Sequence, residues 1–258
     1  MKQGILLAAF GAGNRQGESA LRLFDEEVRA RFPGIAVRWA FTSLLMRERL
    51  AMERKKTDSV RKALEKMAFE RYSHVAVQPL QCVPGREYGE VLDEALALSR
   101  ERDVVVRVGT PLLHSADDVT AAAAALLRHL PAERKQDEAA VWVGHGARHP
   151  ATVRYDALAH AVQGLDPLVY VGTMSDAAAL PRIIEELHEH RRRRVWLLPL
   201  LSVVGRHALR DLAGTDERSW KSRFEAAGVV CTPVLKGSAE YPGFIQIWLD
   251  HLKLALNE

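Results

Sequence analysis

The sequence predicts an α/β protein made of two similar halves, each with a four-stranded parallel sheet flanked by helices. Two observations predict this fold class: short apolar runs alternate with longer segments of helical period, and the whole pattern occurs twice. The chain has 258 residues, of which 48% are hydrophobic and 27% are charged. These values are typical of a folded globular protein and argue against disorder, collagen or a coiled coil.

The first half contains four runs of strand character, each rich in Val, Ile or Leu and bounded by Gly, Pro or polar residues. They cover residues 4–10, 36–41, 75–80 and 104–108. Between them lie segments such as residues 59–72, and residues 117–130 follow the last run; in both, apolar side chains recur at helical spacing. Near-continuous apolar strands joined by helices indicate a parallel sheet that is covered on both faces.

The second half repeats this order, with strand candidates at residues 139–143, 168–171, 195–200 and 229–234. Residues 75–92 align without a gap on residues 195–212, and seven of the 18 positions are identical, where chance gives about one. We interpret this similarity as an internal duplication. The polar stretch 131–138 is the expected linker. The expected halves are therefore residues 1–131 and 138–258, with an active-site cleft between them.

Charge, cysteine content and hydropathy narrow the class of protein. Lys and Arg exceed Asp and Glu by only 36 − 33 = 3, which does not indicate nucleic-acid binding. Cys82 and Cys231 are far apart and form no CxxC pair, so the sequence indicates neither a disulfide framework nor a structural zinc site. No apolar run is long enough for a signal peptide or a membrane span. We expect a cytoplasmic protein without nucleic-acid or membrane partners, and the sequence leaves a homo-oligomer open.

The duplication also identifies candidate functional residues, because ligands of open parallel sheets bind beyond the carboxyl ends of the strands. Phe10 and His145 are equivalent positions after the first strand of each half, and Glu87 and His207 are equivalent positions after the third. Neutral imidazole binds Zn, Co, Ni or Fe and accepts protons near pH 7. The sequence therefore predicts a site with two histidines and a carboxylate. The alternative is that His145 is a loop residue and that His207 and Glu87 simply begin helices.

Other motifs argue against a nucleotide cofactor. Gly11-Ala-Gly13 with Gly17 resembles a dinucleotide-binding loop, but the GxGxxG motif requires its third glycine where this chain has Gln16. No P-loop of the GxxxxGK[ST] type is present. We therefore interpret the glycine segment as a backbone turn. His188-Glu-His190 is a poor chelate, because residues two apart point to different faces of a helix.

Several motifs together resemble one known family. They are Ala40-Phe-Thr-Ser43, Gly109-Thr-Pro-Leu-Leu113, Gly144-His-Gly-Ala147, Pro199-Leu-Leu-Ser-Val-Val-Gly-Arg-His207 and Ser219-Trp-Lys-Ser-Arg-Phe-Glu-Ala-Ala-Gly228. The sequence resembles the anaerobic sirohydrochlorin cobaltochelatases of cobalamin biosynthesis, class II chelatases related to ferrochelatase. The resemblance covers essentially the whole chain and implies the same two-half α/β fold. It implies ATP-independent insertion of Co²⁺ into sirohydrochlorin with release of two protons. Fe²⁺ insertion for sirohaem, Ni²⁺ as the metal, and a non-catalytic tetrapyrrole or metal carrier remain alternatives.

The resemblance also implies a metal site with one departure from the family pattern. In the family two histidines, which match His145 and His207, hold the metal together with a glutamate in the pattern Val-Gly-x-x-Glu. This chain reads Val171-Gly-Thr-Met-Ser175-Asp176, so Ser175 occupies the glutamate position. Asp176 is then the candidate third ligand. The alternative is that Ser175 or Asp176 caps the following helix.

The remaining roles follow from the chemistry that the resemblance implies. His145 is the expected proton acceptor and a metal contact, and His207 is expected to hold the incoming Co²⁺. Glu87 matches a family glutamate and is expected to help deprotonate or position the ring from the opposite wall. Arg86 and Arg206 are candidates for pairing with the carboxylates of sirohydrochlorin, although ordinary surface arginines are the alternative. Phe10 is the other candidate substrate-binding residue.

Overall fold

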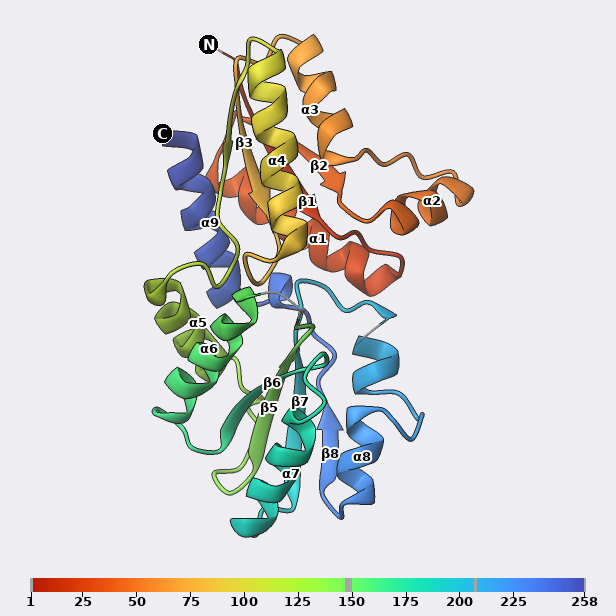
Figure 1. Ribbon diagram of the computed structural model, residues 1–258, viewed down its shortest axis with the longest axis vertical. Helices are drawn as coiled ribbons and strands as arrows, with labels where there is room; N and C mark the ends of the chain where they lie inside the picture. Colours follow the sequence, from red (N-terminus) through yellow and green to blue (C-terminus); the bar gives the residue numbers. More distant parts are fainter. Residues whose placement is uncertain (1, 147–149, 207, 258) are drawn as a thin grey trace. The chain divides into compact units, whose positions relative to one another are not determined.

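The protein contains two four-stranded parallel sheets within residues 2–146, 150–206 and 208–257, the parts of the chain that the computed structural model describes (Figure 1). The strand order is β2-β1-β3-β4 in the first sheet and β6-β5-β7-β8 in the second. These two orders are equivalent when the strands of each half are numbered along the chain. The predicted fold class and the duplication of the scaffold are therefore confirmed.

The elements around the first sheet are β1 (Gln3–Ala9), α1 (Arg15–Arg31), β2 (Ala36–Phe41), α2 (Leu44–Met52), α3 (Val60–Phe69), β3 (His74–Pro79), α4 (Arg86–Glu101), β4 (Val105–Val108) and α9 (Pro242–Asn257). Those around the second sheet are α5 (Ala116–Arg128), β5 (Ala139–Gly144), α6 (Val153–Gln163), β6 (Val169–Thr173), α7 (Ala179–Glu189), β7 (Arg194–Leu200), α8 (Trp220–Ala226) and β8 (Val230–Pro233). Three short turns complete the list: 3₁₀ turns η1 (Pro150–Thr152) and η3 (Ser238–Glu240), and a π-helical turn η2 (Ala208–Leu212).

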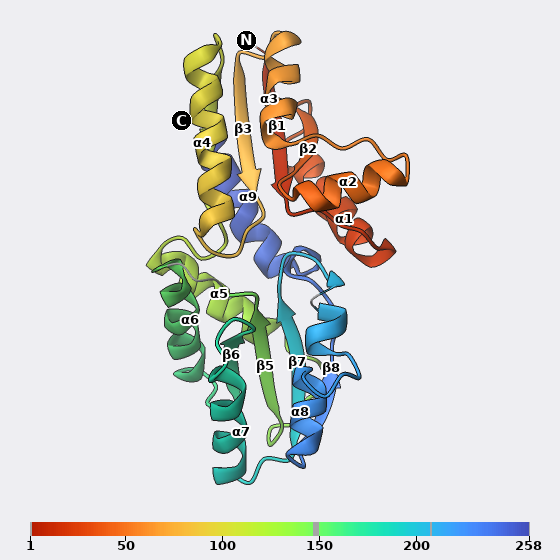
Figure 2. The same ribbon diagram turned by 45° about the vertical axis from the view of Figure 1, so that its right-hand side comes forward.

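Helices cover both faces of the first sheet, as its continuous apolar strands predict. Because side chains alternate along a strand, Leu6 packs toward α3 and α4 while Leu7 is buried on the opposite face. On the α1 and α9 side, Phe24 of α1 meets Trp248 of α9 edge to face, with ring centroids 5.9 Å apart. Figures 1 and 2 both show α9, in dark blue, alongside this sheet.

The second sheet is packed in the same way. Val141 and Val143 of β5 join a buried cluster with Ile183 of α7 and Phe224 of α8. Trp142, between them on β5, is fully buried, and its ring lies edge to face with the ring of Tyr241 at 5.6 Å. The inner strands β1 and β5 are therefore apolar on both faces, which explains why the sequence shows continuous apolar runs there rather than an alternation of apolar and polar residues.

The compact units differ from the expected halves 1–131 and 138–258 in two helices. One unit comprises the chain up to His114 together with the last helix from Phe244, and the other comprises Ser115–Gly243. Helix α5 thus packs in the second unit, where it contacts α6, and α9 packs in the first. An amphipathic helix shows which of its faces is buried but not which sheet it covers, so hydrophobic periodicity could not reveal this exchange.

The expected linker, residues 131–138, is a hydrogen-bonded part of the second unit. The side chain of Glu138 is buried and accepts hydrogen bonds from the indole Nε1 of Trp196 at 2.7 Å and from the backbone N of Lys135 at 3.2 Å. Arg134 binds Asp166 at 2.9 Å. The bond from Trp196 is the largest influence on Glu138 and, despite burial, lowers the pKa of this carboxyl.

Two further observations concern membrane-spanning helices and cysteines. Within the described ranges, we find no helix that has both the length and the apolar character needed to span a membrane. Cys82, which is half-buried, and Cys231, which is buried, are both unbridged thiols.

Candidate functional site

The strand orders create one switch point in each sheet, where successive connections leave the carboxyl edge in opposite directions. In the second sheet this point lies between β5 and β7, which pair with Gly144 opposite Leu200. In the first sheet it lies between β1 and β3, with Ala8 opposite Pro79. Ligands of open parallel sheets bind at such points. The loops to consider are therefore those that follow these four strands.

His145 follows β5 directly and is exposed. Its Nδ1 lies 3.0 Å from the carbonyl oxygen of Gly146. Because a carbonyl oxygen can only accept a hydrogen bond, Nδ1 carries the proton of the neutral ring and the lone pair is on Nε2. The local backbone therefore favours the tautomer in which Nε2 accepts a proton or binds a divalent metal.

The loop after β6 fixes the backbone on which His145 sits. The backbone N of Ser175 donates to the carbonyl oxygen of His145 at 3.2 Å. Gly146 has φ +72°, and a Cβ added there lies 2.0 Å from Ser175 Oγ and 2.8 Å from Thr173 Cβ. Only glycine fits this position. Thr173 is buried and ends an otherwise apolar strand, and no motif in the sequence marks it as a neighbour of the His145 loop.

Ser175 and Asp176 are both exposed, and Ser175 Oγ lies 2.0 Å from a Cβ added at Gly146. Asp176 Oδ1 accepts a hydrogen bond from the backbone N of Ala178 at 2.9 Å, and its Oδ2 lies 3.6 Å from Arg182 Nη2. Asp176 therefore bonds within the turn that precedes α7. The N-cap residue of α7 is Ala178, without a side-chain capping hydrogen bond, so neither Ser175 nor Asp176 is the N-cap of this helix. Within the described part of the chain, the Ser175 hydroxyl and Thr173 are the side chains nearest to a Cβ added at Gly146, the residue after His145.

His207 lies outside the described residues, but the chain on both sides of it is defined. Before it, Leu201 O accepts from Ser238 N at 2.7 Å and Ser202 O accepts from Ala239 N at 3.0 Å. After it comes the π-helical turn η2, anchored by buried Ala208 and Leu212. π-helical turns are rare in proteins, and those that occur are often found at functional sites. The chain that follows His207 thus forms one π-helical turn.

The residues predicted in the first unit lie at the matching carboxyl edge. Glu87 is half-buried in the first turn of α4. Arg86 is exposed, with its Nε 3.6 Å from Glu90 Oε1, and Phe10 is 46% exposed. Arg206, the repeat-related arginine of the second unit, is also exposed. Among the described side chains, no group of three His, Cys, Asp or Glu residues is arranged to hold a metal ion.

The glycine segment after β1 forms a turn. Gly11 has φ +115°, and Asn14 caps α1 by accepting a hydrogen bond from the backbone N of Gly17 at 2.7 Å. The loop therefore uses its polar side chain to begin a helix.

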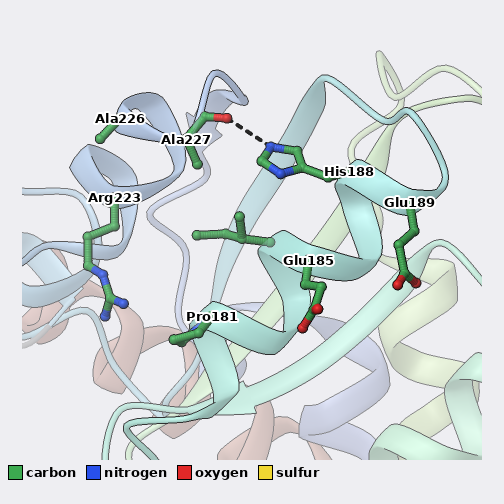
Figure 3. Close-up of a pocket in the computed structure, with 8 residues that line it drawn as sticks. Pro181, Glu185, His188, Glu189, Arg223, Ala226 and Ala227 are labelled. Carbon is green, nitrogen blue, oxygen red and sulfur yellow. Dashed lines mark hydrogen bonds between the residues drawn. The ribbon is translucent and has the colours of Figure 1, made fainter.

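A separate pocket of the second unit lies between α7 and α8 (Figure 3). His188 Nε2 is 2.9 Å from the carbonyl oxygen of Ala227, so the ring donates to the backbone. Figure 3 shows Glu185 and Glu189 extending away from Arg223. The His188-Glu-His190 segment is thus a helix end, and its side chains do not converge on an ion.

Comparison with known proteins identifies the family. The sequence profile of the cobalt chelatase (CbiK) family matches residues 3–257. The chain belongs to the cobalt chelatase (CbiK) family. It is 60% identical over 257 residues to sirohydrochlorin cobaltochelatase CbiKC of Nitratidesulfovibrio vulgaris strain Hildenborough, covering 99% of this chain and 91% of the relative. It is 33% identical over 259 residues to sirohydrochlorin cobaltochelatase of Salmonella typhimurium strain LT2, covering 100% and 97%.

Solved structures show that the chelatase-like fold is shared more widely. SirB from Bacillus subtilis with Fe³⁺ matches with a TM-score of 0.67 and 17% identity, covering 100% of this chain and 97% of that chain. CbiX, described as the terminal enzyme for siroheme biosynthesis in denitrifying bacteria, matches with a TM-score of 0.58 and 16% identity over 98% and 99% of the chains. At these identities the likeness concerns the fold alone.

Proposed function

We propose that this protein inserts Co²⁺ into sirohydrochlorin without ATP and releases the two pyrrole protons of the macrocycle. The observation that carries the proposal is the match to the cobalt chelatase family along residues 3–257, with 60% identity to a sirohydrochlorin cobaltochelatase. The geometry supports it, because His145 lies at the carboxyl edge of the second sheet with its Nδ1 3.0 Å from the carbonyl oxygen of Gly146.

The reaction needs a base, because the metal replaces two N–H protons. His145 Nε2 is the candidate, since neutral imidazole accepts a proton near pH 7. Its Nδ1–H, held by Gly146 O, would stay in place while Nε2 is protonated. Glu87, on the first unit, is the candidate for the second proton or for positioning the ring.

The metal is a substrate, so it has to be released as well as bound. His145 and His207 supply two neutral nitrogen ligands in the proposal. Ser175 gives a hydroxyl where the family pattern has a carboxylate, which leaves more of the positive charge of the ion uncompensated. Asp176 remains the candidate third ligand; its Oδ1 also accepts from Ala178 N, and its Oδ2 lies 3.6 Å from Arg182 Nη2.

The substrate carries carboxylates, for which the exposed guanidinium groups of Arg86 and Arg206 are suited. Phe10 offers an exposed ring at the same edge as Glu87 for contact with the face of the macrocycle. The cytoplasmic location and the independence from nucleotides expected from the sequence stay predictions, as does the oligomeric state.

The test is anaerobic incubation of the protein with sirohydrochlorin and Co²⁺, following the absorbance change on metallation. We expect turnover above the spontaneous rate, nearly lost in His145→Ala and reduced in His207→Ala. His190→Ala is the matched control, because this exposed imidazole at the end of α7 bonds only its own helix through Glu186 O. Wild-type rates in the first two variants would contradict the assigned roles.

The metal is tested in the same assay by replacing Co²⁺ with Fe²⁺ or Ni²⁺ at equal concentration. We expect the highest kcat/KM with Co²⁺. Binding of sirohydrochlorin and metal without turnover for any of the three ions would instead identify a carrier on this fold.

A further inference from the structure

His114 is a side chain of the carboxyl edge that the mechanism above does not use. It follows the motif Gly109-Thr-Pro-Leu-Leu113, which comes after β4, and in the alignment of the two halves it is equivalent to Lys236, which follows β8. Each of the two residues stands beside a tyrosine. The ring of His114 lies 6.5 Å from that of Tyr88 at 59°, and the ammonium of Lys236 lies 4.3 Å from the ring of Tyr241.

The loop that carries His114 is fixed to the segment that leads into α4. Leu112 N donates to Gln81 O at 3.1 Å, and Leu113 N donates to Cys82 O at 2.8 Å. The side chains of Leu112 and Leu113 are fully buried. His114 is therefore an exposed residue on a rigid support, which is what a binding residue needs if it is to lose little conformational entropy.

The base of this loop is also held from the sheet and from the last helix. The carbonyl oxygen of Thr110 accepts from Gln78 Nε2 at 3.0 Å and from His251 Nδ1 at 3.0 Å. Gln78 is fully buried on β3, and His251 is buried on α9. Three elements thus fix the loop after β4 at this edge.

Tyr88 connects His114 with the first turn of α4, where Glu87 is the preceding residue. The half-buried phenol ring packs beside the imidazole and limits where the imidazole can go. The neutral imidazole offers one N–H donor and the imidazolium offers two, so either form suits an anionic oxygen. The first unit therefore presents a fixed N–H donor at the same carboxyl edge of its sheet as Glu87.

We propose that His114 is a substrate-binding residue that donates a hydrogen bond to a peripheral carboxylate of the tetrapyrrole, with Tyr88 holding its ring in place. The proposal rests on the proposed function, because it takes a polycarboxylate tetrapyrrole as the ligand. In this proposal His114 contributes to the affinity for the tetrapyrrole and to its orientation, and it takes no part in proton removal.

The experiment compares His114→Ala, His114→Phe and His114→Gln by titrating metal-free sirohydrochlorin and by steady-state kinetics. Loss of one hydrogen bond to a charged group predicts about a tenfold rise in Kd and in KM for tetrapyrrole in the Ala and Phe variants. The Gln variant keeps an N–H donor and is expected to lose less affinity. We expect kcat and the KM for Co²⁺ to stay near the wild-type values. His190→Ala is again the control.

Two results would overturn the proposal, and melting temperatures show which variants are folded. Wild-type affinity in His114→Phe means that only ring packing matters. A fall in kcat with unchanged Kd means that His114 acts elsewhere. Uroporphyrin, another polycarboxylate tetrapyrrole, separates this inference from the proposed function. If the wild type binds uroporphyrin but does not metallate sirohydrochlorin, only the proposed function fails. If metallation of sirohydrochlorin proceeds and no His114 variant binds the tetrapyrrole more weakly, only this inference fails.

Discussion

Replacement of Gly146 by alanine tests whether the contact between the loops after β5 and β6 positions His145. The added methyl group carries two penalties. The backbone at φ +72° is in the left-handed region, which costs about 1–2 kcal/mol for a residue with a Cβ. The Cβ also lies 2.0 Å from Ser175 Oγ and 2.8 Å from Thr173 Cβ. Ser175 is exposed and can turn away, whereas Thr173 is buried and cannot.

The expected loss of stability follows from these contacts. If the loops separate, the hydrogen bond from Ser175 N to His145 O is also lost, at about 1 kcal/mol. The total is about 2–3 kcal/mol, which lowers Tm by about 4–12 °C for a chain of this size. A shift of His145 by a fraction of an ångström lowers kcat further, by about tenfold or more.

The assays are a thermal melt and the metallation assay, with Gly228→Ala as the matched control. Gly228 also has a left-handed backbone, φ +75°, but nothing lies within 4 Å of its added Cβ. It therefore isolates the backbone cost, and Gly146→Ala should lose more stability and far more activity. Equal Tm and kcat in the Gly146 and Gly228 variants would refute the reasoning.

Three further predictions concern other groups. Folding lowers the pKa of the Glu138 carboxyl, chiefly through the hydrogen bond from Trp196. The carboxylate therefore stabilises the fold at pH values above its ordinary pKa of 4.5, and this stabilisation is lost as the pH falls through the lower pKa of the folded state. Glu138→Gln should therefore lower Tm at pH 7, and the gap from wild type should close in acid; a constant gap contradicts this. Burial raises the pKa of Cys231 to about 12, so a thiol reagent should modify only Cys82 in the native protein, and Cys82→Ser should not react until it unfolds. Ser175→Glu should tighten Co²⁺ binding in a metal titration, whereas an unchanged Kd would show that this position does not face the ion.

The sequence was sufficient to predict the sheets, because a central parallel strand such as β5 must be apolar on both faces. It was also sufficient to align the two halves, and hence to place His145 at the carboxyl edge, because a duplicated scaffold keeps strand ends in register. The sequence could not predict which sheet α5 and α9 pack against. Their apolar stripes fit either sheet, and only the tertiary packing decides between them.

The limits at the site are local. Sequence reasoning could not tell which bonds the Asp176 carboxylate makes, because they depend on where the fold places Ala178 N and Arg182. Nor could it find the contact of Gly146 with Thr173, because a left-handed backbone and a close approach leave no mark except the glycine itself. His207 stays a prediction, as it lies outside the described residues.

The exchange of helices affects the order in which the protein can mature during synthesis. Domains that are continuous in sequence generally fold from the N-terminus as they leave the ribosome. Here the unit formed by residues 1–114 lacks the helix bearing Trp248, the partner of Phe24, until the chain beyond residue 243 has been translated. Its apolar face stays exposed while residues 115–243, a continuous stretch, already contain everything that the other unit needs. The first unit to be started is therefore the last to be finished, and a premature stop before residue 244 leaves its sheet open to aggregation.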